Sequence, residues 1–92
     1  MTDTYLQISR DTKYIRIGIP NDDDIDYIDI NFLTNDKYWG IVIVIDASSS
    51  IITRLFPYDI DYKELEIEYN NRRLSLIVTM NEHMYTVTLT EM

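Results

Sequence analysis

Most of the chain alternates between apolar and polar residues with a period of two, which is the spacing of a β-strand with one face in water. One run departs from this pattern. Residues 39–46, Trp-Gly-Ile-Val-Ile-Val-Ile-Asp, contain no polar side chain before the final aspartate and are mostly β-branched. Such a run is typical of a strand covered on both faces, so we expect it at the centre of a sheet.

Alternation before this run predicts strands over residues 5–10, 14–19 and 25–33. The turn residues 11–13 favour a hairpin of the first two strands, with Ile8 opposite either Ile17 or Ile15. The three adjacent carboxylates of residues 22–24 are expected to form a loop.

A two-residue turn at Asn35-Asp36 would pair the third strand with the central one. It would place three apolar pairs opposite one another: Phe32 and Trp39, Ile30 and Ile41, Ile28 and Ile43. After the polar break from Asp46 to Ser50, residues 48–56 have two interpretations, a strand or a short helix. The β-branched residues 51–53 favour the strand.

The last thirty residues predict a three-stranded meander over residues 64–69, 72–80 and 83–90. Asn70-Asn71 suits a turn with positive φ at both positions, because Asn tolerates this conformation. Two-residue turns set Leu65 opposite Leu76, Ile67 opposite Leu74, Leu76 opposite Val87, and Leu74 opposite Leu89. The same registers bring Glu68 to Arg73 and Arg72 to Glu91. Asn81-Glu82 lacks a glycine, which also allows a longer loop there.

Together these segments predict an all-β fold: an antiparallel β-sandwich or small barrel of seven to eight short strands with hairpin and meander connections. The length predicts one β domain, residues 1–92. Matched parity across the hairpins predicts the core, which is Leu6, Ile8, Ile17, Ile28, Ile30, Phe32, Trp39, Ile41, Ile43, Leu65, Ile67, Leu74, Leu76, Val78, Tyr85, Val87 and Leu89.

The net charge is −8, and the negative charge is concentrated in the middle of the chain. Residues 20–68 hold twelve acids against three bases, a balance of −9. Direct binding to nucleic acid or to an anionic membrane is therefore not expected, and a basic partner protein is the natural complement. Solubility alone is the alternative explanation of the charge.

No catalytic motif, cofactor motif or metal motif is found, so we expect a protein that is not an enzyme. The chain has no cysteine, which excludes disulfides and thiolate metal sites. Asp22, Asp24 and Asp26 resemble the start of a calcium loop, but Tyr27 and Leu33 occupy its glycine and glutamate positions. The single histidine, His83, has no nucleophile or second ligand beside it.

Two acidic groups are the candidate partner-binding residues. The first is a row on one strand face, about 6.7 Å apart, formed by Glu64, Glu66 and Glu68. The second comprises Asp22, Asp23, Asp24, Asp26 and Asp29. Protection of a sheet edge is the alternative role of the row. Tyrosines among the acids (Tyr27, Tyr38, Tyr58 and Tyr62) suit a protein-binding surface.

In size, acidity and lack of catalytic motif the chain is similar to small inhibitors made by phages and mobile elements: anti-CRISPR, anti-restriction and nuclease-immunity proteins. The resemblance implies a DNA mimic that blocks the basic nucleic-acid site of a partner protein. The alternative function is a structural or assembly module. Such a module would pair through an exposed strand edge or through Ile77, Thr79 and Met84 on the outer face of the terminal meander. No signal peptide is visible, so we expect a cytoplasmic monomer or homodimer, in the host cell if phage-encoded.

Overall fold

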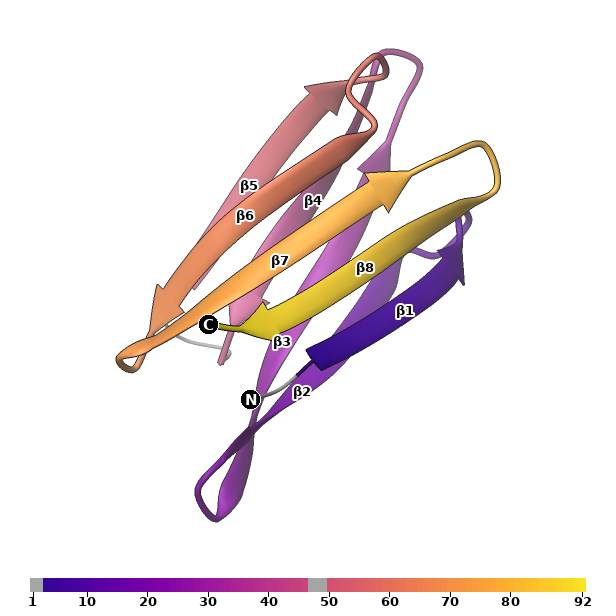
Figure 1. The fold of residues 1–92 in the computed structure, drawn as a ribbon. Helices are drawn as coiled ribbons and strands as arrows, with labels where there is room; N and C mark the ends of the chain where they lie inside the picture. Colours follow the sequence, from indigo (N-terminus) through magenta and orange to yellow (C-terminus); the bar gives the residue numbers. More distant parts are fainter. Residues whose placement is uncertain (1–2, 47–49) are drawn as a thin grey trace. The chain divides into compact units, whose positions relative to one another are not determined.

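The structure is a computed structural model that describes residues 3–46 and 50–92 (Figure 1). These residues form eight β-strands and no helix, which confirms the predicted all-β antiparallel fold. The strands are β1 (Asp3–Ser9), β2 (Tyr14–Asn21), β3 (Asp24–Thr34), β4 (Tyr38–Ile45), β5 (Ser50–Pro57), β6 (Tyr62–Tyr69), β7 (Arg72–Met80) and β8 (Met84–Glu91). Within the described ranges there is accordingly no helix able to cross a membrane.

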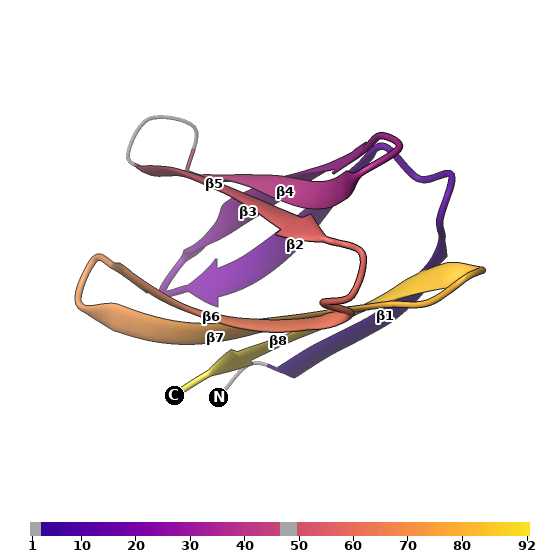
Figure 2. The same cartoon turned by 90° about the horizontal axis from the view of Figure 1, so that it is seen from above.

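The strands form two antiparallel sheets of four strands, each within its own compact unit. Met1–Asp11 and Ile60–Met92 make up the first unit, with strand order β1-β8-β7-β6 (Figure 2). Thr12–Asp59 makes up the second, with strand order β2-β3-β4-β5. Each sheet therefore has two edge strands: β1 and β6 in the first, β2 and β5 in the second.

The predicted hairpin between the first two strands is wrong. β1 pairs with β8, where Leu6 lies opposite Val87, and β2 pairs with β3, where Ile17 lies opposite Ile28. Apolar alternation fits either arrangement equally well, so it does not determine the partner. A charge pair adds to the observed choice, because Arg16 lies directly across from Asp29.

Two predicted registers are wrong by two residues, for the same reason. Phe32 lies opposite Ile41 rather than Trp39, and Leu76 lies opposite Leu89 rather than Val87. Both turns contain an asparagine that lengthens the loop. A shift of two keeps every side chain on its predicted face, so the facial assignment remains correct.

The two asparagine turns have the same hydrogen bonds. Asn35 Oδ1 accepts from the backbone N–H groups of Lys37 and Tyr38 at 2.8 and 2.7 Å, and the Asn35 N–H donates to the Tyr38 carbonyl. Asn81 Oδ1 likewise accepts from residues 83 and 84 at 2.8 and 2.9 Å. An asparagine side chain that replaces a backbone acceptor in this way stabilises a turn longer than two residues.

The register and turn of the β6–β7 hairpin follow the prediction, although β6 begins two residues earlier than expected, at Tyr62. Leu65 lies opposite Leu76, and Glu68 lies opposite Arg73. Asn70 and Asn71 have φ values of 48° and 60°, so both adopt the left-handed conformation that this two-residue turn requires.

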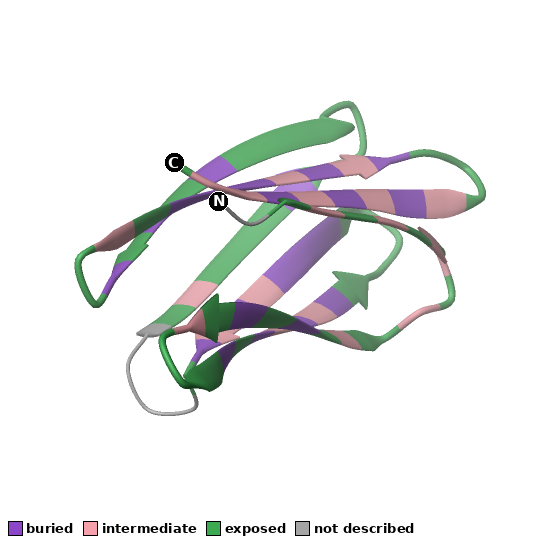
Figure 3. Ribbon diagram, turned by 60° about the horizontal axis from the view of Figure 1, so that its bottom comes forward, coloured by how far each residue is buried: buried purple, intermediate pink, exposed green. Residues whose placement is uncertain are grey.

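One face of each sheet carries the core, visible as alternating bands of buried and exposed residues along the strands (Figure 3). The predicted core residues are buried except Leu6 and Ile8 of edge strand β1, which are half-buried. Among the described residues, the prediction missed five buried hydrophobic side chains: Ile19, Ile45, Phe56, Tyr69 and Met80.

β4 lies between β3 and β5, as expected for the most apolar run. Only one of its faces is fully covered, however. Ile41 and Ile43 are completely buried, whereas Val42 and Val44 on the other face are half-buried. The expectation that both faces would be covered is therefore wrong for the second face. β5 is a strand, as favoured, while residues 47–49 of the uncertain segment lie outside the described residues.

Candidate interaction surface

The half-covered face of β4 belongs to an apolar surface on the second unit. We call this side of the β2-β3-β4-β5 sheet the outer face; it is opposite the side that carries Ile41 and Ile43. Its apolar cluster consists of Leu33, Tyr38, Val42, Val44, Ile51 and Leu55. The registers set Ile51 directly opposite Val44 and place Leu33 and Leu55 on either side of Gly40. Val42 lies between Asn31 on β3 and Thr53 on β5.

The exposure of this cluster is unusual for strand residues. Ile51 is 72% exposed, Leu55 59%, Tyr38 44% and Leu33 42%. Single exposed apolar side chains are common on protein surfaces, but neighbouring ones on a flat sheet are typical of interaction sites. The sequence contains the signal, because Ile51 and Leu55 have the parity opposite to buried Phe56. The prediction treated residues 51–56 as a single segment and did not assign their side chains to the two faces of the sheet.

Gly40 allows the cluster to pack closely. It lies between Leu33 on β3 and Leu55 on β5, directly opposite both. A Cβ atom at this position would lie 2.6 Å from Leu55 Cδ2 and 2.6 Å from the Arg54 carbonyl oxygen. The Leu55 side chain therefore occupies the space above Gly40.

The charges of the second unit are polarised along its strands. At one end lie the exposed Asp22, Asp23 and Asp24 of the β2–β3 turn and the exposed Asp46 after β4. We call this the acidic end; among the described residues it contains no Lys or Arg. Asp22 has a φ of 45°, which an aspartate tolerates in a tight turn.

The opposite end of the same sheet is balanced. It carries Asp36 and Asp59 together with Lys13 and Lys37, and all four side chains are exposed. The β2–β3 hairpin extends past β4 at the acidic end, because β3 begins at Asp24 but pairs with β4 only from Ile28 (Figure 1). Three carboxylates therefore project at the tip of a two-stranded ribbon.

The other two candidate aspartates do not join this exposed group. Asp26 lies on the face opposite the outer face, where it is 9% exposed and accepts a hydrogen bond from Asn21 Nδ2 at 3.0 Å. Asp29 lies on the outer face and is held by Arg16, whose Nε and Nη2 donate to its two oxygens at 2.6 and 3.1 Å. Alternation along β3 thus separates them.

Asp29 belongs to a small polar network on the outer face. Tyr14 Oη donates to Asp29 Oδ1 at 2.6 Å, the oxygen that also accepts from Arg16 Nε. The Arg16 guanidinium lies 4.8 Å from the centre of the Tyr27 ring. Hydrogen bonds from Arg16 and then Tyr14 lower the pKa of the Asp29 carboxyl below its ordinary value. The hydrogen bond to Asp29 raises the pKa of the Tyr14 phenol. The negative charge of Asp29 is therefore already compensated by Arg16 within the same unit.

Glu64, Glu66 and Glu68 form the predicted exposed row on edge strand β6 of the first unit. Glu66 and Glu68 both make ion pairs with Arg73 on β7, and Glu64 accepts a hydrogen bond from Ser75 Oγ at 3.0 Å. Only the Glu68 pair was foreseen. The row is therefore partly compensated, and it lies in a different compact unit from the aspartates.

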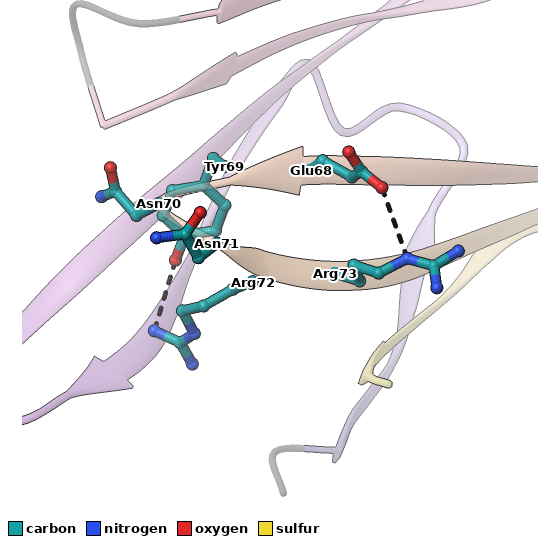
Figure 4. Close-up of a pocket in the computed structure, with 6 residues that line it drawn as sticks. All are labelled: Glu68, Tyr69, Asn70, Asn71, Arg72 and Arg73. Carbon is teal, nitrogen blue, oxygen red and sulfur yellow. Dashed lines mark hydrogen bonds and ion pairs between the residues drawn. The ribbon is translucent and has the colours of Figure 1, made fainter.

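Other features of the first unit are weaker candidates for an interaction site than the apolar cluster. A shallow hollow at the β6–β7 turn is lined by residues 68–73 (Figure 4). Arg72 in this hollow is occupied by a two-point ion pair with Glu91. Ile77, Thr79 and Met84 on the outer side of the meander are only half-exposed. His83 is exposed in its turn, and its Nε2 atom lies 3.8 Å from Oε2 of the adjacent Glu82.

No three His, Cys, Asp or Glu side chains in residues 3–46 and 50–92 are grouped so that they could hold a metal ion. Comparison of the chain with protein-family models, with curated proteins and with solved structures finds no match in any of the three.

Proposed function

We propose that this chain is a small acidic, non-enzymatic binding protein that attaches to a basic partner protein through the outer face of its β2-β3-β4-β5 sheet. The observation that carries the proposal is the apolar cluster, which spans β3, β4 and β5 and whose members Leu33, Tyr38, Ile51 and Leu55 are each more than two-fifths exposed. Burial of such a cluster in an interface is favourable by about 25 cal/mol per Å² of apolar surface.

The acidic end indicates that the partner carries positive charge. Asp22, Asp23 and Asp24 belong to the same sheet as the apolar cluster, and no Lys or Arg lies at that end among the described residues. A partner with an apolar patch bordered by Lys or Arg would match both features. The charges would speed association, and the apolar contacts would supply most of the affinity.

The second candidate is charge mimicry of nucleic acid, as in phage or mobile-element inhibitors of anti-CRISPR, anti-restriction or nuclease-immunity type. The three projecting aspartates of the β2–β3 tip favour it. The pairing of Asp29 with Arg16 and of Glu66 with Arg73 weighs against it, because these carboxylates are already compensated. In this candidate a basic nucleic-acid site of the partner is blocked by carboxylates.

The test is capture of a partner by the tagged protein from the cells in which it acts, followed by purification of the complex. Amide hydrogen exchange of the free and bound protein then locates the contact. The proposal expects slower exchange in β4 and β5 together with the β2–β3 tip. Protection confined to the β2–β3 tip and β6, with none in β4 and β5, would contradict it and favour charge mimicry.

A further inference from the structure

The four edge strands of the two sheets differ in how they are protected from pairing with another strand. β6 carries Lys63 and the glutamate row, and β2 carries Arg16 and Pro20. β1 presents mainly polar side chains on its exposed face. Charges, prolines and short polar edges are the usual means by which a sheet edge is kept from pairing.

β5 lacks this protection. Its sequence Ser-Ile-Ile-Thr-Arg-Leu-Phe-Pro has one charged residue, no acid, and no proline before its last position. Ile51 and Leu55 are the most exposed aliphatic side chains in the described strands, at 72% and 59%. In a chain of net charge −8, β5 is a stretch where another copy can approach without meeting a carboxylate.

We propose that β5 pairs antiparallel with β5 of a second copy of the chain, with Thr53 opposite Thr53 on the two-fold axis. This inference does not depend on the proposed function. In this register Ile51 of each copy lies opposite Leu55 of the other, and all of these side chains remain on the outer face. Cross-strand Thr–Thr and aliphatic pairs stabilise antiparallel sheets.

The neighbouring registers are less favourable. A two-fold axis at Arg54 would set two guanidinium groups directly opposite each other, which is destabilising. A shift by one residue would turn the outer face of one copy to the opposite side and would bring Ile51 and Leu55 out of contact. The self-complementarity of the strand is therefore centred on Thr53.

The distribution of charge favours the same antiparallel arrangement. It places the acidic end of one copy beside the balanced end of the other, which carries Lys13 and Lys37. A parallel arrangement would bring the two acidic ends together, with Asp22, Asp23, Asp24 and Asp46 of both copies on the same side. Like charges brought together in this way repel and oppose association.

A cysteine scan tests the register, because the chain has no cysteine of its own. Directly opposed residues of an antiparallel pair have Cα atoms about 4.5–5.5 Å apart, within the range of a disulfide. The Thr53→Cys protein should form a disulfide-linked dimer under mild oxidation. Ile51→Cys alone should not, because residue 51 is offset from its own copy by four residues, about 13 Å. The double variant Ile51→Cys/Leu55→Cys should cross-link again.

Light scattering of the unmodified protein over a range of concentrations gives the second arm. The proposal expects a mass that rises to twice 11.0 kDa. Ile51→Lys should shift this dimerisation to at least about tenfold higher concentration, whereas Ile25→Lys, also on an exposed aliphatic residue but at the β2–β3 tip, should not. A mass of one copy at every concentration would overturn the proposal. So would an Ile51→Cys protein that cross-links as readily as Thr53→Cys.

Discussion

Leu55 covers Gly40: the two residues lie opposite each other on β5 and β4, and a Cβ atom on residue 40 would lie 2.6 Å from Leu55 Cδ2. The same added atom would lie 2.6 Å from the backbone oxygen of Arg54. A side chain can rotate away, but the backbone of a paired strand cannot do so without loss of its register. Gly40 is thus required for close packing of β5 on β4.

We therefore predict that Gly40→Ala destabilises the protein by about 1–3 kcal/mol, as overpacking of a tight site does. Gly18→Ala is the matched control. Its added Cβ would meet only side chains, the nearest being Ile25 Cγ2 at 3.1 Å, and these can move. Urea denaturation of the two variants measures the difference. Equal stability of Gly40→Ala and the parent protein would show that β5 does not pack as described.

The second prediction concerns the core face of β4. Ile43 is completely buried, so Ile43→Ala should lower the free energy of unfolding by about 2–5 kcal/mol. Val44→Ala is the control on the adjacent position of the same strand. Because Val44 is half-buried on the outer face, its truncation should cost clearly less. A larger loss for Val44 than for Ile43 would mean that the two faces have been assigned the wrong way round.

The third prediction concerns the asparagine turns. Asn81→Ala removes the acceptor for the N–H groups of His83 and Met84, and it should cost about 1 kcal/mol. Asn81→Asp keeps an oxygen acceptor and should retain most of the stability. Thermal or chemical denaturation distinguishes the two variants. Alanine and aspartate variants of equal stability would show that the side chain does not hold this turn.

The length of these turns could not be predicted from the sequence. Alternation located β1, β2, β3, β6, β7 and β8, and the uninterrupted apolar run located β4, whereas residues 48–56 were left open between a strand and a short helix. The β6–β7 register was predicted correctly, because Asn70-Asn71 specifies a two-residue turn and Glu68–Arg73 agrees with it. An isolated asparagine does not reveal whether its side chain will accept backbone hydrogen bonds. The loops at Asn35 and Asn81 were therefore predicted too short or left open.

The pairing of strands that are distant in the chain could not be predicted from the sequence, for a different reason. β1 joins β8, and nothing in the apolar pattern of β1 distinguishes β8 from β2 as its partner. The candidate surface was missed in part because exposure depends on facial parity across several strands. Of the candidate acids, Asp26 and Asp29 proved to be buried and ion-paired respectively, which clustering in the sequence does not show.

The fourth prediction concerns pH. Arg16 and Tyr14 lower the pKa of Asp29 from its ordinary value of 3.8, so the carboxylate stabilises the fold. That contribution is fully present above the ordinary pKa and is lost as the pH falls through the lower pKa of the folded protein. In Tyr14→Phe the pKa of Asp29 should rise toward 3.8, and acid unfolding should begin at a higher pH.

Titration of the Asp29 carboxyl carbon by NMR measures this shift directly. Tyr5→Phe serves as the control, because Tyr5 is an exposed tyrosine on β1 in the other unit and should leave Asp29 unchanged. An Asp29 titration that is the same in the parent protein and in Tyr14→Phe would show that the Tyr14 hydrogen bond does not form in solution.

The central claim is that the outer face, rather than the carboxylates, supplies most of the binding energy. Three variants isolate these contributions. Leu33→Ser/Tyr38→Ser removes exposed apolar groups from β3 and β4, away from the β5 edge. Glu64→Gln/Glu66→Gln/Glu68→Gln removes the acidic row. A third variant, Asp22→Asn/Asp23→Asn/Asp24→Asn, removes the charges of the β2–β3 tip.

Calorimetric affinities of these variants for the purified partner, at low and high salt, are the most direct measurement. We predict that Leu33→Ser/Tyr38→Ser weakens binding by at least about 2 kcal/mol at both salt concentrations, as loss of central apolar contacts does. The aspartate variant should weaken binding mainly at low salt, and the glutamate variant should bind as the parent does. Unchanged affinity of Leu33→Ser/Tyr38→Ser, with large losses in both charge variants, would contradict the account and establish charge mimicry in its place.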